Sequence, residues 1–462
     1  MKDMTSGNPL KLIIRFALPL LLGNLLQQLY NVADAAIVGH YLGSNALAAV
    51  GVTSSVQFLI FGFCIGSCTG FCVPIAQKFG AKDYKRMRSL VYNSILLTIL
   101  LSVIITAACV ILTPAILKFL STPADIWEDS YIYIIIMFSG IPFTLLYNLS
   151  ASILRAMGNS RTPFLFLSIS TVTNIFLDYY CVAILNWGCA GAAAATVASQ
   201  AFSGILCAYV LLKKYEILHM MPNEKKADRK EMKQLLLMGI PMGLQFSITA
   251  IGSMVMQSSN NALGSLYVSA FTAASRIKMF AMCPFDAIAT GVATFCSQNY
   301  GAGKIARIRK GYHIGTIISV IYGLFAGSLL IIFGKASCLI FLSSTEDTIL
   351  SAAGLFLNRS GFFFWVLGLL NLNRTAVQGL GYSGRAMFSG VMEMIARISV
   401  VVLFVPAFGF EAICLADPAA WIAADFYIIP TCLYVLSKLT GSNMFHHEIT
   451  SLRHKVLHKH AA

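Results

Sequence analysis

Apolar runs long enough to cross a membrane recur along this chain, and they constrain its fold more than any other feature. A bilayer-spanning helix needs about 20 predominantly apolar residues. Apolar residues make up 57% of the 462 residues, and only 11% are charged, whereas soluble domains average about 25% charged residues. Because backbone polar groups in lipid must be paired within the chain, such runs have to form helices. The composition therefore excludes a soluble globule and indicates an all-α integral membrane protein.

Charged, Gly/Pro-rich and Asn-rich breaks divide the apolar runs into twelve predicted spans. The spans are expected at residues 12–39, 46–77, 89–119, 127–154, 163–185, 189–212, 234–259, 267–299, 312–341, 352–380, 386–407 and 411–437. An even number of spans places both termini on one side, and 26 of the 33 Lys and Arg residues fall on that side. The positive-inside rule makes this side cytoplasmic. The opposite loops are predicted to be acidic and to include Glu411 and Asp417.

The two halves of the chain resemble each other at an offset of 221–223 residues. AQKFGAKDYKRMR, residues 76–88, aligns with SQNYGAGKIARIR, residues 297–309, and RAMGNSRT aligns with QGLGYSGR. Each half has six predicted spans, so the repeats are parallel, an arrangement typical of two-lobed transporters that work by alternating access. The predicted domains are an N-terminal six-helix lobe at 1–212, a cytoplasmic linker at 213–233, a C-terminal six-helix lobe at 234–437 and a cytoplasmic tail at 438–462.

Acidic residues inside predicted spans are candidates for function, because a charge in hydrocarbon is costly. Asp34 and Asp178 each lie 15 residues beyond a proline, which places both at a similar depth, about 22 Å along their helices. Asn174 lies one turn from Asp178, and Thr196 falls at nearly the same level. These groups could bind a proton, or a hard cation such as Na⁺ through oxygen ligands. Alternatively, each acid lies near a helix end in the wetter interface.

The second half of the chain does not repeat these acids. At the repeat offset, Asp34 falls on Met256 or Gln257, and Asp178 falls on Val400 or Val401. This asymmetry predicts ion coupling in one lobe only.

A proline interrupts the first predicted span. Pro19 cannot donate a hydrogen bond to the carbonyl of Arg15, so the helix is expected to bend most easily there.

Other charges within the spans allow more than one interpretation. Glu393 and Arg397 are spaced i, i+4 and are predicted to form a structural ion pair. Asp286 follows Pro284 and is expected either to pair with Lys278 on the same helix or to contact substrate. A further set of residues could line an adaptable cavity, although helical packing is the commoner role of such side chains. This set comprises Phe246, Met256, Gln257, Met279, Met282, Phe285 and Asp286.

Several motifs resemble the multidrug and toxic compound extrusion (MATE) family. They are LPLLLGNLLQQLYNVADAAIVGHYLG at residues 18–43, the loops QKFGAKD and QNYGAGK, RAMGNSRTP at 155–163 and NIFLDY at 174–179. The resemblance implies two six-helix lobes forming an outward-facing V. It also implies export of organic, often cationic, compounds against an inward flow of H⁺ or Na⁺, with no other cofactor.

The resemblance also assigns roles to individual residues. The family's helix 1 acid matches Asp34, and an Asn, an Asp and a Thr of its prokaryotic, DNA-damage-inducible-type branch match Asn174, Asp178 and Thr196. The branch that places acids on helices 7 and 10 is not matched, because residues 239–257 and 356–380 contain no Asp or Glu. The implied protein is a functional monomer of the bacterial inner membrane that binds a small organic substrate.

Two other functions compete with this interpretation. A flippase for a lipid-linked saccharide would need a basic cavity, for which the sequence offers Arg276, Lys278, Arg359 and Arg374. A polytopic membrane enzyme would need clustered acids or histidines at a membrane face, and the predicted loops lack such pairs, so no enzyme is expected. Nucleic-acid binding is not expected either, because the basic residues lie in short loops between apolar runs.

Overall fold

The computed structural model describes residues 3–120, 122–342 and 347–440, and this described part contains helices but no strands. The long helices are α1 (Pro9–Gly80), α2 (Tyr84–Phe119), α3 (Trp127–Ser139), α4 (Ile141–Ala156), α5 (Arg161–Asp178), α6 (Gly188–Lys214), α7 (Arg229–Ala262), α8 (Ser265–Gly301), α9 (Ile305–Ser337), α10 (Asp347–Phe362), α11 (Phe364–Gly379), α12 (Ser383–Phe408) and α13 (Phe410–Thr440). Short helical segments are η1 (Ala124–Ile126), η2 (Tyr179–Ile184), η3 (Glu216–Leu218), η4 (Pro222–Glu224) and η5 (Cys338–Ile340).

The twelve predicted spans are all found, although two of them are joined in one helix and two others are each divided by a bend. Helix α1 holds the first two spans, which meet at Gly43, whose φ of 86° suits a residue without a side chain. The fourth span consists of α3 and α4, bent by 42°, and the tenth consists of α10 and α11, bent by 54°. Within the described residues the helices therefore provide twelve membrane crossings, as predicted.

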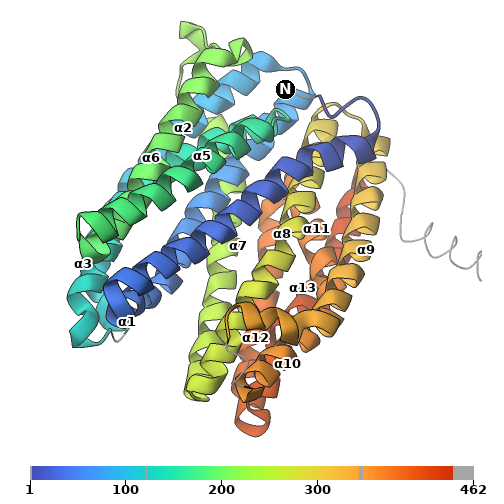
Figure 1. Cartoon of the computed structure of the whole chain (residues 1–462). Coiled ribbons are helices and arrows are strands. Elements are labelled where there is room, and N and C mark those ends of the chain that lie inside the picture. Colours follow the sequence, from blue (N-terminus) through green and yellow to red (C-terminus); the bar gives the residue numbers. More distant parts are fainter. Residues whose placement is uncertain (1–2, 121, 343–346, 441–462) are drawn as a thin grey trace, which may run out of the picture.

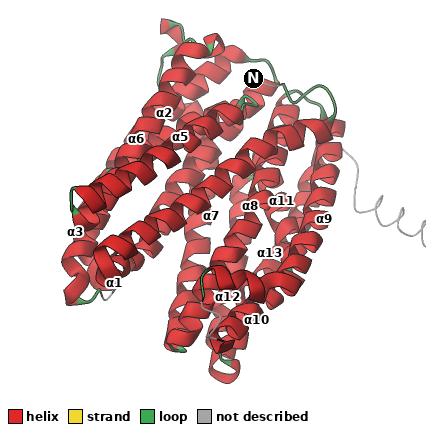
Figure 2. Ribbon diagram, viewed as in Figure 1, coloured by secondary structure: helices red, strands yellow, loops and turns green. Residues whose placement is uncertain are grey.

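The helices form two lobes, as Figure 1 shows by their blue-green and yellow-red halves. Helices α2–α6 surround one hydrophobic core, and α8–α13 surround a second, larger one. The lobes meet near the N-terminus and diverge toward the other end, and the connecting loops lie at the ends of the helices (Figure 2). We call the end that holds the N-terminus the closed end.

The start of the chain packs with the second lobe rather than with the first. Met4, Ile13 and Phe16 are buried in the core of α8–α13. Farther along, α1 leaves this core, and its second span packs in the core of the first lobe. Helix α1 thus belongs to both lobes.

Small residues allow α1 to cross α7 closely. A Cβ atom on Gly70 would lie 2.6 Å from the Cα of Gly239, and one on Gly66 would lie 2.9 Å from the Cα of Gly243. Any larger side chain at these positions would separate the two helices. Stripes of small residues permit such close helix contact. Here the contact joins α1 to α7 and thereby one lobe to the other.

The linker between the lobes is attached to the first lobe. Arg88 on α2 donates two hydrogen bonds of 2.6 Å to the carboxylate of Glu224 in η4. Asn93 on α2 donates to Glu231 near the start of α7 at 3.1 Å. Of the predicted tail at 438–462, residues 441–462 lie outside the described part.

Candidate functional site

The four residues of the predicted ion site meet in the first lobe. Asp178 ends α5, and Asn174, one turn earlier, donates a hydrogen bond of 3.4 Å to the hydroxyl of Thr196 on α6. Asp34 on α1 lies close enough to Asp178 for the two carboxylates to interact electrostatically. Helix α1 and the consecutive helices α5 and α6 thus bring two acids, an amide and a hydroxyl together.

The acids of this site are poorly satisfied by the protein itself. Asp178 is completely buried, and neither of its carboxylate oxygens has a hydrogen-bond partner among the described residues. The amide oxygen of Asn174 is likewise without a partner among them. An isolated buried carboxylate is costly, so this position needs either a proton or a bound cation.

Two tyrosines that the sequence analysis missed complete the surroundings of the acids. The hydroxyl of Tyr30 lies 3.1 Å from that of Thr196. Tyr133 on α3 is buried within electrostatic range of Asp34 and Asp178. Tyr30 precedes Asp34 by four residues and therefore shares its helix face, a spacing that would have identified it; nothing in the sequence singles out Tyr133.

The backbone changes its geometry directly after Asp178. Residues Tyr179–Ile184 form a π-helix, a rare form that is frequently found at functional sites. Beyond it, away from the closed end, Val38, Val182 and Ala192 pack in a small apolar cluster. Each of these three residues is about one turn from a site residue, so the cluster covers the site on that side.

Pro19 is buried inside α1, and the helix continues through it. The non-helical residue within the described α1 is Gly43, which joins the two spans. The backbone at the predicted weak point, Pro19, is thus helical in this structure.

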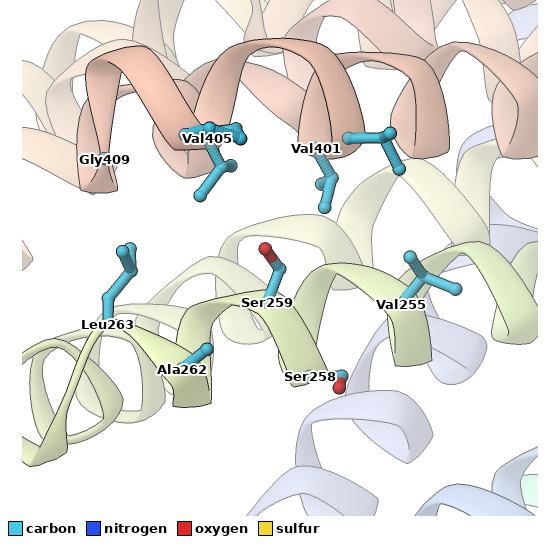
Figure 3. Close-up of a pocket in the computed structure, with 10 residues that line it drawn as sticks. Val255, Ser258, Ser259, Ala262, Leu263, Val401, Val405 and Gly409 are labelled. Atoms are coloured by element: carbon cyan, nitrogen blue, oxygen red, sulfur yellow. The ribbon is translucent and has the colours of Figure 1, made fainter.

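The equivalent place in the second lobe is an apolar pocket of about 680 Å³ between α7 and α12. Figure 3 shows Val401 and Val405 facing Val255 and Ser259 across this space. Val401 is one of the two residues onto which Asp178 falls at the repeat offset. At the place of Asp178 the second lobe therefore has a valine that lines an apolar space, whereas Met256 and Gln257, the residues aligned with Asp34, are not part of this lining.

The predicted cavity residues separate into two groups. Met256 and Phe285 are buried in the core of the second lobe, which fits the packing role that the sequence also allowed, and the partly exposed Met282 packs against that core. They lie on the inner faces of α7 and α8, which sequence spacing alone did not distinguish. Gln257 bonds to Asn261 on its own helix at 2.8 Å. Exposed surface remains on Phe246 (37%), Met279 (45%) and Asp286.

Most charges inside the second lobe are paired with one another. Glu393 accepts hydrogen bonds from Arg397 at 2.9 Å, as the i, i+4 spacing predicts, and from Arg374 at 2.7 Å. Asp417 binds Arg397 at 2.9 Å and also binds Lys278. These five side chains link α8, α11, α12 and α13 in one buried network.

The network corrects two expectations from sequence. Lys278 pairs with Asp417 and not with Asp286, which instead accepts a hydrogen bond of 3.4 Å from Asn371. Asp417 is 4% exposed within α13 rather than in an outer loop. Asp417 lies seven residues after the start of α13. This position inside an apolar run already indicated that Asp417 belongs to a span and not to a loop.

A further acid, Asp425, lies two turns beyond Asp417 on α13. It is 7% exposed, and neither of its carboxylate oxygens has a hydrogen-bond partner in the part of the chain that the structure describes. Arg374 is near enough to interact with it electrostatically. The sequence analysis missed Asp425, although an acid in the middle of a predicted span is the signal that identified Asp34.

Comparison with known proteins identifies the family. The probable multidrug resistance protein YpnP of Bacillus subtilis is 29% identical over 367 residues, which cover 79% of this chain and 82% of that protein. The probable multidrug resistance protein NorM of Thermotoga maritima is 26% identical over 376 residues, or 80% of each chain. A solved structure described as an outward-facing conformation of a multidrug resistance MATE family transporter of the MOP superfamily shares the fold, with a TM-score of 0.89, 22% identity and coverage of 95% of this chain and 98% of that one.

The sequence model of the MatE family matches one segment in each lobe, residues 19–180 and 241–403. The predictions of a twelve-span MATE-like fold, and of a transporter rather than an enzyme, are confirmed by these matches. Because the two segments cover more than half of the chain, this protein belongs to the MatE family of membrane transporters.

Proposed function

We propose that this protein is a secondary active antiporter that exports organic, often cationic, compounds in exchange for H⁺ or Na⁺. The observation that carries the proposal is the buried, unpartnered carboxylate of Asp178, which lies beside Asp34 in one lobe only. The names of the related proteins, which describe multidrug resistance, support the substrate class. Asp34, Asn174, Asp178 and Thr196 form the coupling site, and no cofactor beyond the ion is required.

Alternating access follows from the two-lobed arrangement. The end that carries the repeated basic loops faces the cytoplasm of a bacterial inner membrane, as do both termini, and the diverging end faces outward. Ion and substrate must favour opposite states of the same element, since a ligand with equal affinity for both states shifts nothing. The functional unit is a monomer, because one chain contains both lobes.

Helix α1 transmits ion binding to the substrate cavity in this proposal. Neutralising Asp34 with a proton or Na⁺ removes an unpaired charge and lets α1 bend at Pro19, where a backbone hydrogen bond is already absent. The bend narrows the cavity of the first lobe and displaces the substrate outward. Phe246, Met279 and Asp286, which remain exposed, are the residues of the second lobe that we propose to contact substrate.

Transport in proteoliposomes tests this function. Efflux of a fluorescent organic cation is measured with a pH gradient alone and then with a Na⁺ gradient alone. Export driven by one gradient identifies the coupling ion. If neither gradient drives export of any organic cation tested, the antiport proposal is wrong.

The flippase alternative has less support. Three of the four basic residues that could bind a pyrophosphate are already paired with acids: Lys278 with Asp417, Arg359 with Glu411 and Arg374 with Glu393. Binding a lipid-linked phosphate would require these pairs to break.

A further inference from the structure

The repeated segments QKFG, at the end of α1, and QNYG, at the end of α8, touch each other at the closed end. A Cβ atom on Gly80 would lie 1.9 Å from the carbonyl oxygen of Gln298, and one on Gly301 would lie 1.7 Å from the carbonyl oxygen of Gln77. Each helix end thus approaches the backbone of the other without space for a methyl group. The contact is reciprocal, because the glycine of each repeat lies against the glutamine carbonyl of the other repeat.

The two glutamines extend this exchange across the lobes. Gln298 Nε2 donates to the carbonyl oxygen of Ala156 at 2.8 Å, and Gln77 Nε2 donates to that of Gly379 at 3.3 Å. Ala156 and Gly379 are 223 residues apart and occupy the same position in the repeat. Gln298 is completely buried, so its bond is also shielded from water.

The start of the chain, at Met4, binds to the residues of α8 and α9 that surround this contact. Gln298 Oε1 accepts a hydrogen bond from the backbone of Met4 at 2.9 Å. The carbonyl oxygen of Met4 accepts from Asn299 at 3.1 Å and from Arg307 at 3.2 Å. Because α1 continues from here to Asp34, the chain that carries the ion site is anchored on the opposite lobe.

We propose that Gln77, Gly80, Gln298 and Gly301 form a two-fold latch that holds the cytoplasmic end shut. This proposal rests on the proposed alternating-access function, because only a transporter that opens at this end must break the latch. Side-chain hydrogen bonds of Gln77 and Gln298 join the lobes here, beside bonds from Asn299, Lys304 and Arg307 to the start of the chain. A polar pocket of about 510 Å³, lined by Asp3, Lys82, Lys304 and neighbouring residues of both loops, reaches the contact from the outside. Opening this end separates helix ends of opposite lobes, and the close crossing of α1 and α7 at Gly66 and Gly70 must move with it.

The test measures the distance between the lobes by electron spin resonance on the full chain in nanodiscs. Spin labels are attached to Lys85→Cys and Lys310→Cys, which are exposed positions on α2 and α9. The twelve native cysteines are all buried, so labelling is selective. Gly80→Ala and Gly301→Ala insert a methyl group into the contact and should each raise the population with separated lobes about tenfold. Gly384→Ala, near the same end with no atom within 4 Å of its added Cβ, is the matched control and should not change the distances.

Isosteric variants separate the latch from general packing. Gln298→Glu keeps the acceptor for Met4 but loses the donor to Ala156, so it should open the closed end while the N-terminal anchor stays in place. Gln77→Glu should have a smaller effect, because its bond is longer and less buried. Wild-type distances in folded Gly80→Ala, Gly301→Ala and Gln298→Glu would overturn the latch. The distance measurement needs neither substrate nor an ion gradient. If the wild-type protein does not transport any compound but the variants still separate the lobes, the antiport proposal is refuted and the latch stands.

Discussion

The two lobes share one helical frame but treat their charges in opposite ways. In the first lobe, Asp34 and Asp178 have no cationic partner among the described residues. In the second lobe, the equivalent space between α7 and α12 is apolar, and Glu393 and Asp417 are held by arginines and a lysine. Removing one member of a buried ion pair is strongly destabilising, whereas an unpaired buried carboxylate itself costs free energy until it takes up a proton or a cation. The comparison supports the proposed ion site of the first lobe, and it shows that most charges of the second lobe hold helices together, with Asp425 as a buried acid that has no hydrogen-bond partner among the described residues.

Neutralising the unpaired acid should give the largest effect. Asp34→Asn keeps the side-chain volume but removes the titratable charge, so gradient-driven export should fall to the level of protein-free liposomes while the protein stays folded. Efflux and thermal unfolding measure the two properties. Glu411→Gln, which changes an exposed acid of the second lobe, is the control. Normal export by Asp34→Asn at every pH tested would remove Asp34 from the coupling mechanism.

Neutralising a paired acid should affect stability instead. Glu393→Gln leaves Arg374 and Arg397 without their shared counter-charge, and the free energy of unfolding should fall by about 3–5 kcal/mol. Asp347→Asn breaks an exposed pair with Lys335 and should cost at most about 1 kcal/mol. Chemical denaturation of the purified proteins measures both values. Unchanged stability of Glu393→Gln combined with lost ion coupling would place function in the second lobe and reverse the comparison.

The residues around Asp178 should act as a unit. With Asp34 intact, Asn174→Ala and Asp178→Asn should show a coupling free energy of about 0.5–3 kcal/mol in coupling-ion affinity, as residues of one network do. The pair Asn174→Ala and Asp286→Asn, in different lobes, should be additive within about 0.5 kcal/mol. Ion titrations of the single and double variants measure these terms. Additivity of the first pair would show that Asn174 and Asp178 do not share a site.

The proline of α1 should have a moderate kinetic effect. Pro19→Ala restores a backbone donor and stiffens the helix, so turnover should slow several-fold while equilibrium substrate binding changes less. Pro114→Ala, in a lipid-exposed part of α2, should leave turnover unchanged. Rates are compared at matched reconstitution and matched gradient. Equal turnover of Pro19→Ala and wild type would mean that the lobes move as rigid bodies, without a bend in α1.

The smallest effect concerns the linker, which is attached to the first lobe. Hydrogen bonds from Arg88 lower the pKa of Glu224 from its ordinary 4.5 to about 2. A carboxyl group with a lowered pKa stabilises the folded state above its unfolded value, and this contribution is lost as the pH falls. Wild type should therefore unfold at a slightly higher temperature than Glu224→Gln at pH 7, and the difference should shrink as the pH drops from about 4.5 toward 2. A difference that does not depend on pH would show that packing, rather than charge, holds the linker.

Much of the candidate site was predictable from sequence because its signals are local. Asp34, Asn174, Asp178 and Thr196 were found from helix spacing and from the cost of charge in lipid, and the structure brings them together. Tyr133 was missed because its neighbours come from other helices. For Phe285 the sequence left cavity lining and packing both open, because helix spacing does not reveal which face meets the core; the structure buries this ring.

The number of spans, their approximate ends, the parallel repeat and the side richest in basic residues were determined by the sequence alone. These features depend on hydropathy, length and charge, which each segment carries by itself. Only the tertiary structure decided that Lys278 pairs with Asp417, 139 residues away, and that Gln298 reaches Ala156, 142 residues away. Such contacts depend on how each helix is rotated and tilted against its neighbours, and that geometry is set by the packing of all the helices together.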